Sequence, residues 1–240
     1  MSKATRIASI SLGLLFLCGR ALATTVFALY TPQGIVIGSD SKIVALNGPD
    51  ASYGCKIHVA GRFAWASAGL LAETRGPFDL RGIVKASLDG TVSFREAAGR
   101  LKRFTDAKYH DFRERSIQGG VSAEMAYTDV LLAGVGADQI PHVSVMRFGR
   151  IAPTTECPSA KCPKFGLLEL GVYARIDDIL FGPHGQVHTI WKSKGVPDAI
   201  AYLIAAQERA TPELVGGPIS ILEINKSGPH WIVPGVCGAQ

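Results

Sequence analysis

The boundary between residues 23 and 24 constrains this chain most, because two segments of opposite character meet there. Lys3 and Arg6 make the start basic, an apolar run follows over Ile7–Cys18, and the segment ends in Ala21-Leu22-Ala23. This combination is typical of a secretory signal with an Ala-x-Ala cleavage site. The apolar run is shorter than the roughly 20 residues of a transmembrane helix. We therefore predict that residues 1–23 are a signal peptide and that the mature chain is exported, either to the periplasm or as a secreted protein.

Cleavage at this boundary would make Thr24 the first residue of the mature chain. A terminal threonine carries a free α-amine and a hydroxyl, which can act together as a base and a nucleophile. Two alternatives stay open. One is a lipoprotein signal acylated at Cys18, although Leu17 is larger than the residue that usually precedes such a cysteine. The other is an end that is uncleaved or processed elsewhere. In both alternatives Thr24 lacks a free amine.

The segment that follows the signal has the composition of a globular protein. Hydrophobic residues make up 47% of the whole chain and charged residues 19%, which argues against disorder. Without the three basic residues of the signal, 22 basic residues face 20 acidic ones. No basic run with interleaved aromatic residues occurs either, so we predict no nucleic-acid partner. The length and the lack of an internal linker predict one domain over residues 24–240.

Four cysteines remain after the signal: Cys55, Cys157, Cys162 and Cys237. An even number in an exported protein is compatible with two disulfides. The spacing of Cys157 and Cys162 suits a hairpin loop, which favours that pair and then Cys55–Cys237. Free buried thiols and a zinc site remain open. Zinc is the weaker alternative because the spacings are not those of zinc ribbons.

The chain lacks clear motifs for a metal or a cofactor. His184 and His188 are spaced like two ligands on one helix turn, but Gly182, Pro183 and Gly185 argue against a helix there. No Gly-rich dinucleotide or phosphate loop follows a predicted strand. We therefore predict neither a metal nor a cofactor.

The order of the predicted elements indicates helices packed outside stacked strands. Period-2 and continuous apolar patterns predict strands over Thr24–Tyr30, Gly34–Asp40, Lys56–Ala60, Phe63–Ala68, Ala126–Gly134, Pro141–Phe148, Phe165–Tyr173, Ile219–Ile224 and Trp231–Val233. Helical spacing predicts helices over Phe78–Leu88, Ser93–Arg115 and Val196–Glu208. The segment Ile151–Lys164 is predicted to be a surface excursion. This order favours an α+β layered sandwich over a doubly wound sheet.

A terminal threonine needs three kinds of chemical support, and the chain offers a residue for each. A nearby ammonium would favour the alkoxide and keep the α-amine neutral, and Lys56 opens the third predicted strand. A buried lysine needs a carboxylate to hold its charge, and Asp40 ends the second strand. A forming oxyanion needs backbone N–H donors, often from a glycine turn before a helix, and Gly69 follows the fourth strand.

With these residues the chain resembles the proteasome β-subunit family and its relative, the peptidase subunit of bacterial ATP-dependent proteases. Both are N-terminal-nucleophile hydrolases. The resemblance rests on Thr24-Thr25-Val26, on Gly34-Ile35-Val36-Ile37-Gly38-Ser39-Asp40, on Lys56-Ile57 and on Gly69-x-x-Ala72-Glu73. In that family an aspartate lies 16 residues and a lysine 32 residues after the nucleophile, as Asp40 and Lys56 do after Thr24. The glycine lies within one residue of its family position.

The resemblance implies a role for each residue and an αββα four-layer sandwich. Thr24 would be the nucleophile and its α-amine the general base. Lys56 would tune the threonine, Asp40 would hold Lys56, and the Gly69 amide would stabilise the oxyanion. The implied reaction is hydrolysis of an amide or peptide bond through an acyl-enzyme ester. Because the family forms rings, a homo-oligomer is also implied.

One part of the family pattern is missing from the chain. The family usually carries an Asp-x-x-Ser-Gly element before a late strand and a serine in an earlier loop, and these groups support the α-amine. Here the matching segment reads Thr211-Pro212-Glu213-Leu214-Val215-Gly216-Gly217, without the aspartate or the serine. This departure keeps open an inactive exported module used for assembly or binding, and the four cysteines keep open an unrelated disulfide-bonded binding protein.

The sequence therefore favours an exported threonine hydrolase acting on short peptides or small amides. The periplasm has no ATP supply, so we expect no ATPase partner. Each candidate also has a purely structural explanation. Thr24 could simply begin a strand, Asp40 could be a turn acid, Lys56 could face solvent and Gly69 could be a plain turn.

Overall fold

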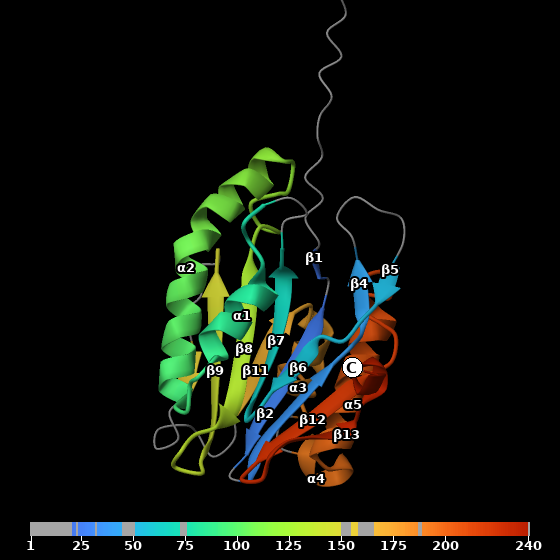
Figure 1. Cartoon of the computed structure of the whole chain (residues 1–240). Coiled ribbons are helices and arrows are strands. Elements are labelled where there is room, and N and C mark those ends of the chain that lie inside the picture. The colour runs from blue at the N-terminus through green and yellow to red at the C-terminus, as the bar shows by residue number, and fades with distance from the viewer. Residues whose placement is uncertain are drawn as a thin grey trace, which may run out of the picture.

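The structure is a computed structural model, shown in Figure 1. The residues described below are 21–22, 24–31, 33–44, 51–72, 76–149, 155–157, 166–186 and 189–239. They form two large antiparallel sheets, a small two-stranded sheet and helices on the outer faces of the large sheets, so the chain is an α+β protein.

The first sheet contains six strands, all between residues 21 and 157. Its strands are β1 (Ala21–Leu22), β6 (Ile57–Ala60), β7 (Phe63–Leu70), β8 (Thr128–Val135), β9 (Pro141–Phe148) and β10 (Thr155–Cys157). They lie in the order β1-β7-β8-β9-β10, and β6 pairs with β7, as β1 does.

The second sheet brings the early strands next to the last ones. Its strands are β2 (Thr25–Thr31), β3 (Gly34–Ser39), β11 (Gly166–Gly171), β12 (Ser220–Asn225) and β13 (Gly228–Val233), in the order β11-β2-β3-β12-β13. A separate pair consists of β4 (Lys42–Val44) and β5 (Ala51–Tyr53). The chain therefore changes sheets between β1 and β2, at the predicted cleavage boundary.

The helices fall into two groups on opposite sides (Figure 1). Helices α1 (Leu80–Leu88) and α2 (Phe94–Gln118) pack on the first sheet. Helices α3 (Ala174–Phe181), α4 (Ile190–Lys194) and α5 (Val196–Ala210) pack on the second. A short 3₁₀ helix, η1 (Gly235–Ala239), follows β13.

Strand β2 shows why the sheets are covered on both faces. Val26 and Ala28 point into the apolar cluster shared by the two sheets, whereas Phe27 and Leu29 point into the cluster under α3–α5. All four side chains are buried, which is why this strand reads as a continuous apolar run rather than an alternating one.

The predicted elements are largely confirmed, with shifts of a few residues at their ends. Strand β9 has the predicted bounds, and α2 extends three residues beyond its predicted end at Arg115. Helices α3 and α4, strands β4 and β5 and the 3₁₀ helix were not predicted. The excursion over Ile151–Lys164 lies outside the described residues except for β10, which pairs with β9.

The structure joins Cys55 to Cys237 in a disulfide, as predicted. The predicted Cys157–Cys162 pair lies outside the described residues because Cys162 does. Within the described part of the chain, every helix is too short or too polar to span a membrane.

Gly38 allows helix α5 to lie directly on β3. A Cβ atom at this position would lie 2.3 Å from Ile200 Cγ2 and 3.0 Å from Ile204 Cδ1. We expect Gly38→Ala to lower the free energy of unfolding by about 1–3 kcal/mol, the usual cost of overpacking. Adding Ile200→Leu, which removes the Cγ2 methyl, should recover part of that loss. Urea denaturation measures both.

Gly99 in α2 provides a matched control, since a Cβ there would approach only Arg103 Nη1, at 3.7 Å. Gly99→Ala should raise stability by up to about 1 kcal/mol, because glycine disfavours a helix interior. A Gly38→Ala protein as stable as the unmodified protein would contradict the close packing of α5 on β3.

Candidate active site

Asp40 and Lys56 form an ion pair in the interior of the protein. Asp40 directly follows β3 of the second sheet, and Lys56 directly precedes β6 of the first. Lys56 Nζ lies 2.8 Å from Asp40 Oδ1, and both side chains are fully buried. The predicted pairing of these residues is therefore present, and the purely structural alternative in which Lys56 faces solvent is excluded.

The Asp40 carboxylate also accepts three backbone hydrogen bonds. Thr25 N–H donates to Oδ1 at 2.9 Å, while Gly216 N–H and Lys42 N–H donate to Oδ2 at 3.1 and 3.2 Å. A buried charge is tolerated only when such donors replace the water it has lost. Asp40 therefore fixes the position of the residue after Thr24 as well as that of Lys56.

The environment of Lys56 shifts its proton affinity. Burial lowers the pKa of the Lys56 ammonium to about 8, and the charge of Asp40 and its hydrogen bond oppose this shift. Desolvation penalises the charged form of a lysine, and a nearby carboxylate favours it. Lys56 thus remains a cation near neutral pH and loses its proton in the weakly alkaline range.

Thr24 is fully buried and precedes Thr25, whose N–H binds the Asp40 carboxylate. Its Oγ1 has no hydrogen-bond partner among the residues that the structure describes. A buried hydroxyl without a partner costs free energy, and most buried polar groups are hydrogen-bonded. The hydroxyl of this predicted nucleophile is therefore an exception to that rule. The chain is uncleaved here, so the nitrogen of Thr24 is an amide rather than an amine.

A turn after β11 holds Thr24 and was missed by sequence reasoning. Val172 N–H donates to Thr24 O at 2.8 Å, and the Thr25 hydroxyl donates to Val172 O at 2.5 Å. Gly171 has a φ of +83°, and a Cβ there would lie 1.7 Å from Thr24 O. Only glycine permits this close approach. The sequence signal was a glycine at the end of an apolar strand.

Gly69 lies inside the last part of β7, so its prediction as a turn between a strand and a helix needs correction. It has a φ of +89°, and a Cβ there would lie 2.2 Å from Tyr127 O. Gly69 is paired with Leu22 of β1, two residues before Thr24. The strand extends two residues past its predicted end because Gly69 and Leu70 are paired with β1. Gly69 also pairs with Thr128 of β8, and Leu70 N–H donates to Tyr127 O.

The segment before β12 contributes backbone rather than side chains. Gly216 donates to Asp40, and its carbonyl accepts from Ser41 N at 3.1 Å and Lys42 N at 2.9 Å. Val215 is fully buried and apolar, and Glu213 is exposed. The acid at Glu213 therefore does not replace the carboxylate that the family pattern places in this segment.

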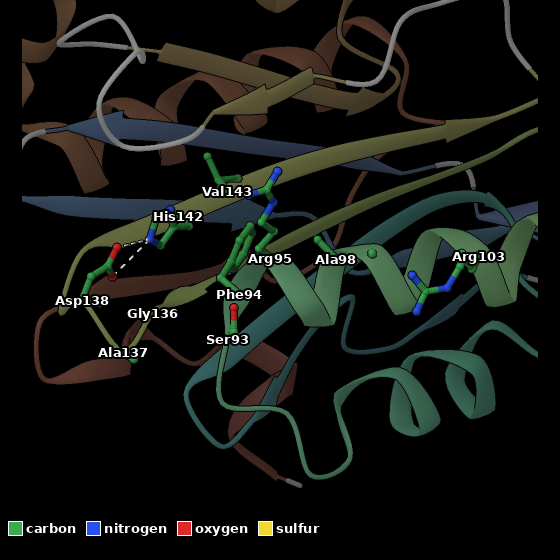
Figure 2. Close-up of a pocket in the computed structure, with 11 residues that line it drawn as sticks. Ser93, Phe94, Arg95, Ala98, Arg103, Gly136, Ala137, Asp138, His142 and Val143 are labelled. Carbon is green, nitrogen blue, oxygen red and sulfur yellow. Dashed lines mark hydrogen bonds and ion pairs between the residues drawn. The ribbon is translucent and has the colours of Figure 1, made fainter.

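A cavity of about 830 Å³ lies away from these residues (Figure 2). It is formed by the start of α2 and by the turn between β8 and β9, at the end of β8 opposite to the one that pairs with Gly69. Its wall includes Arg95, Arg103 and the Asp138–His142 pair, with a distance of 3.0 Å from His142 Nε2 to Asp138 Oδ2. None of the predicted site residues lines it.

The described residues contain no cluster of three or more His, Cys, Asp or Glu side chains suited to a metal. His188, one of the two histidines weighed as metal ligands, lies outside those residues.

Comparison with known proteins identifies the fold but not the family. No protein-family model matches the chain, and no curated protein matches it either. Among solved structures, Anbu (ancestral beta-subunit) from Yersinia bercovieri is similar, with a TM-score of 0.58 and 14% identity over 87% of each chain. Anbu from Hyphomicrobium sp. strain MC1 has the same values, and its Gly-1 mutant has a TM-score of 0.55 and 14% identity over 88% of each chain.

These findings correct the family assignment made from the sequence. The prediction that the chain belongs with the proteasome β-subunits is wrong as a statement of family, because likeness at 14% identity supports a proteasome-like fold at most. At such identity a buried apolar pattern can preserve a backbone while the side-chain chemistry diverges. The chain therefore has a proteasome-like α+β fold, and its family is unspecified.

Removing Lys56 should leave the Asp40 carboxylate buried without its partner. We expect Lys56→Met to lower the free energy of unfolding by about 3–5 kcal/mol, the usual cost of breaking a buried pair on one side. Asp40→Asn combined with Lys56→Met should cost less than the sum of the two single changes. Urea denaturation at pH 7 gives these values.

Lys102→Met is the matched control, since it removes a lysine whose pair with Asp106 is half exposed. Exposed pairs contribute about 1 kcal/mol or less. Equal losses for the two lysine variants would show that Lys56 is not held in a buried pair.

Proposed function

We propose that the chain is an exported N-terminal threonine hydrolase, freed by cleavage after Ala23 and acting on amide or peptide bonds through an ester on Thr24. The proposal rests mainly on the buried Lys56–Asp40 ion pair, whose carboxylate also binds the backbone of Thr25. Thr25 directly follows Thr24, whose buried hydroxyl has no partner among the described residues.

In the proposed reaction, Thr24 Oγ1 attacks the carbonyl carbon of the substrate, and its proton passes to the α-amine. The Gly69 N–H stabilises the oxyanion that forms. Collapse of this intermediate breaks the C–N bond, and the leaving amine takes the proton from the α-ammonium. Water then hydrolyses the ester, with the α-amine again acting as base. Lys56 remains a cation that favours the alkoxide and keeps the α-amine neutral.

The position of β1 supports a peptide or small amide as substrate. In the uncleaved chain β1 covers the edge of β7 at Gly69 and Leu70. Loss of residues 1–23 would free this edge, and an extended peptide can pair with a free strand edge through its backbone. We propose no ATPase partner and no nucleic-acid partner.

We further propose that residues 24–240 form one domain with the four layers α, β, β and α. The three apolar clusters support this arrangement: α1–α2 against the first sheet, sheet against sheet, and second sheet against α3–α5. A homo-oligomer is also proposed, by analogy with the beta-subunit named in the similar structures. Native mass spectrometry that detects only a monomer would remove the homo-oligomer.

A second candidate is an inactive module of the same fold, used for assembly or binding. Its support is the segment before β12, where Val215 is buried and apolar and Glu213 is exposed. Val215 offers no polar group, and the exposed Glu213 does not replace the carboxylate of the family pattern.

The test of the hydrolase is the mature protein purified after export. We expect its sequence to begin at Thr24, and an epoxyketone or β-lactone probe to add to Thr24 in the intact mass. Thr24→Ser should keep the adduct because serine retains the hydroxyl, and Thr24→Ala should lose it. A different first residue overturns the mechanism. The right first residue with no adduct at high probe concentration favours the inactive module.

The rate of probe addition should depend on pH as a bell. The rate should rise as the α-amine, whose pKa in peptides is about 7.7–8.0, loses its proton. It should fall at higher pH as the Lys56 ammonium, with a pKa of about 8, loses its proton. In Lys56→Arg the cation persists, so the alkaline fall should vanish even if the maximum rate drops. An unchanged alkaline fall in this variant would show that Lys56 does not control it. Adduct formation measured from pH 5 to pH 10 on the mature protein provides these curves.

A further inference from the structure

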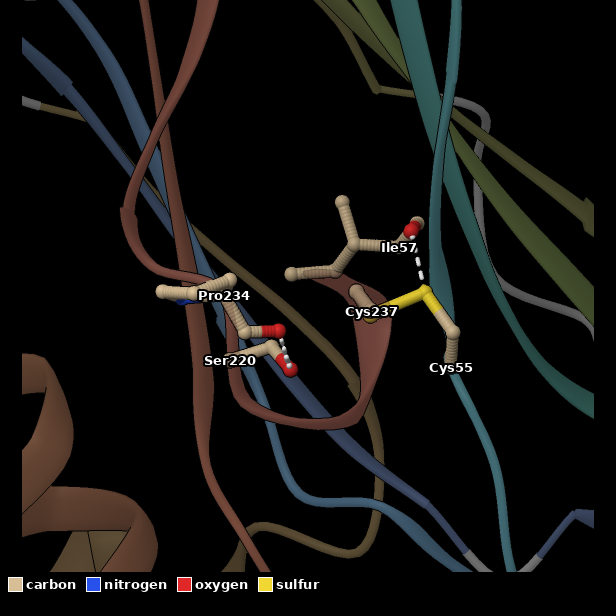
Figure 3. Close-up of a disulfide and its surroundings, with 5 residues drawn as sticks. All are labelled: Cys55, Ile57, Ser220, Pro234 and Cys237. Atoms are coloured by element: carbon tan, nitrogen blue, oxygen red, sulfur yellow. Dashed lines mark hydrogen bonds between the residues drawn. A yellow bond between two sulfur atoms is a disulfide. The ribbon is translucent and has the colours of Figure 1, made fainter. Parts of the chain in front are cut away.

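The disulfide lies directly beside the candidate active site in the sequence. Cys55 precedes Lys56, and its partner Cys237 lies 182 residues later in η1 (Figure 3). Both cysteines are buried. Cys55 Sγ also lies 2.7 Å from the carbonyl oxygen of Ile57, a close contact rather than a conventional hydrogen bond, since a disulfide sulfur carries no proton.

The Cys237 end of the bridge is anchored on strand β12. Cys237 N–H donates to Pro234 O at 2.8 Å, and Ser220 Oγ donates to the same oxygen at 3.0 Å (Figure 3). Ser220 begins β12 and is paired with Ser39 at the end of β3. Ser39 in turn precedes Asp40.

Through these links both members of the ion pair are connected to strand β12. Asp40 reaches β12 through the pairing of Ser39 with Ser220, and Lys56 reaches it through the disulfide and the Pro234 carbonyl. The 2.8 Å contact between Lys56 Nζ and Asp40 Oδ1 then joins the two residues directly.

The two strands that flank Lys56 in the sequence are short. On one side Gly54 N–H donates to Ser41 O at 2.9 Å, next to the three-residue strand β5. On the other side is β6, four residues long, whose outer residues Val59 and Ala60 are exposed. Burial lowers the pKa of Lys56, and the charge and hydrogen bond of Asp40 oppose this shift, so the contact with Asp40 favours the ammonium.

We propose that the Cys55–Cys237 disulfide positions Lys56 against Asp40 for the reaction at Thr24. The inference rests on the proposed hydrolase function for its catalytic consequence, but the positioning itself can be measured without activity. Reduction by an external dithiol would break the S–S bond, convert both cysteines to thiols with two electrons and two protons, and oxidise the dithiol to its disulfide.

The decisive variant is Cys55→Ser with Cys237→Ser in the mature protein. We expect probe addition to Thr24 to slow by about tenfold to a hundredfold, because small displacements of a supporting group have effects of that size. The alkaline fall of the pH curve should move to higher pH as Lys56 returns to water. Hydrogen exchange of the backbone over residues 51–60 should increase more than that of β8. Cys157→Ser with Cys162→Ser is the matched control and should change none of these.

Two further arms keep the test decisive. If the double variant does not fold, mild reduction of the folded protein and Ser220→Ala, which removes the hydroxyl anchor of Pro234, take its place and should produce the same changes at smaller size. If the unmodified protein does not react with the probe, the proposed function fails, and exchange over residues 51–60 alone decides the positioning. Unchanged exchange there, or a slower rate with an unchanged pH curve, overturns the inference.

Discussion

The buried ion pair between Lys56 and Asp40 is the interaction on which the rest of the site depends. It joins the two large sheets, since Asp40 follows β3 of one and Lys56 precedes β6 of the other. Two charges cannot be buried unless their remaining hydrogen-bonding capacity is used. That requirement brings the backbone of Thr25, Lys42 and Gly216 to the carboxylate. One carboxylate thereby sets the relative positions of the first strand of the second sheet, the segment before β12 and the lysine.

The sequence predicted β2, β3, β7 and β8 well because these strands are buried on both faces. The short apolar run of β2, rich in β-branched and aromatic residues, is typical of an interior strand. Helix α3 was missed because it is short: its buried residues, Ile176 and Leu180, span a single turn, and Asp177 and Asp178 lie between them. The small strands β4 and β5 depend on pairing with each other across residues 45–50, and no local apolar pattern marks such pairing.

The candidate site likewise contains residues that could be predicted from the sequence and residues that could not. Asp40 and Lys56 could be predicted because their chemistry is carried by side chains at fixed distances along the chain from Thr24. Val172 and Gly216 could not, since they act through backbone atoms and lie 147 residues from Thr25 and 176 residues from Asp40 respectively. A backbone donor leaves no signature in residue type. Only a glycine forced by close approach, as at Gly171, leaves a trace.

The passage of the chain between the sheets determines what the proposed cleavage after Ala23 would remove. β1 belongs to the first sheet and pairs with β7 at two positions, whereas β2 is paired along its whole length within the second. Cutting between them would remove only two strand pairings and leave β2 fixed by β3 and β11. The new terminus would then lie where the ion pair already bridges the sheets. An ammonium forming there would face the cation of Lys56, and like charges disfavour protonation of an amine. Lys56, whose ion pair with Asp40 joins the two sheets, would thus also keep the terminal amine in its basic form.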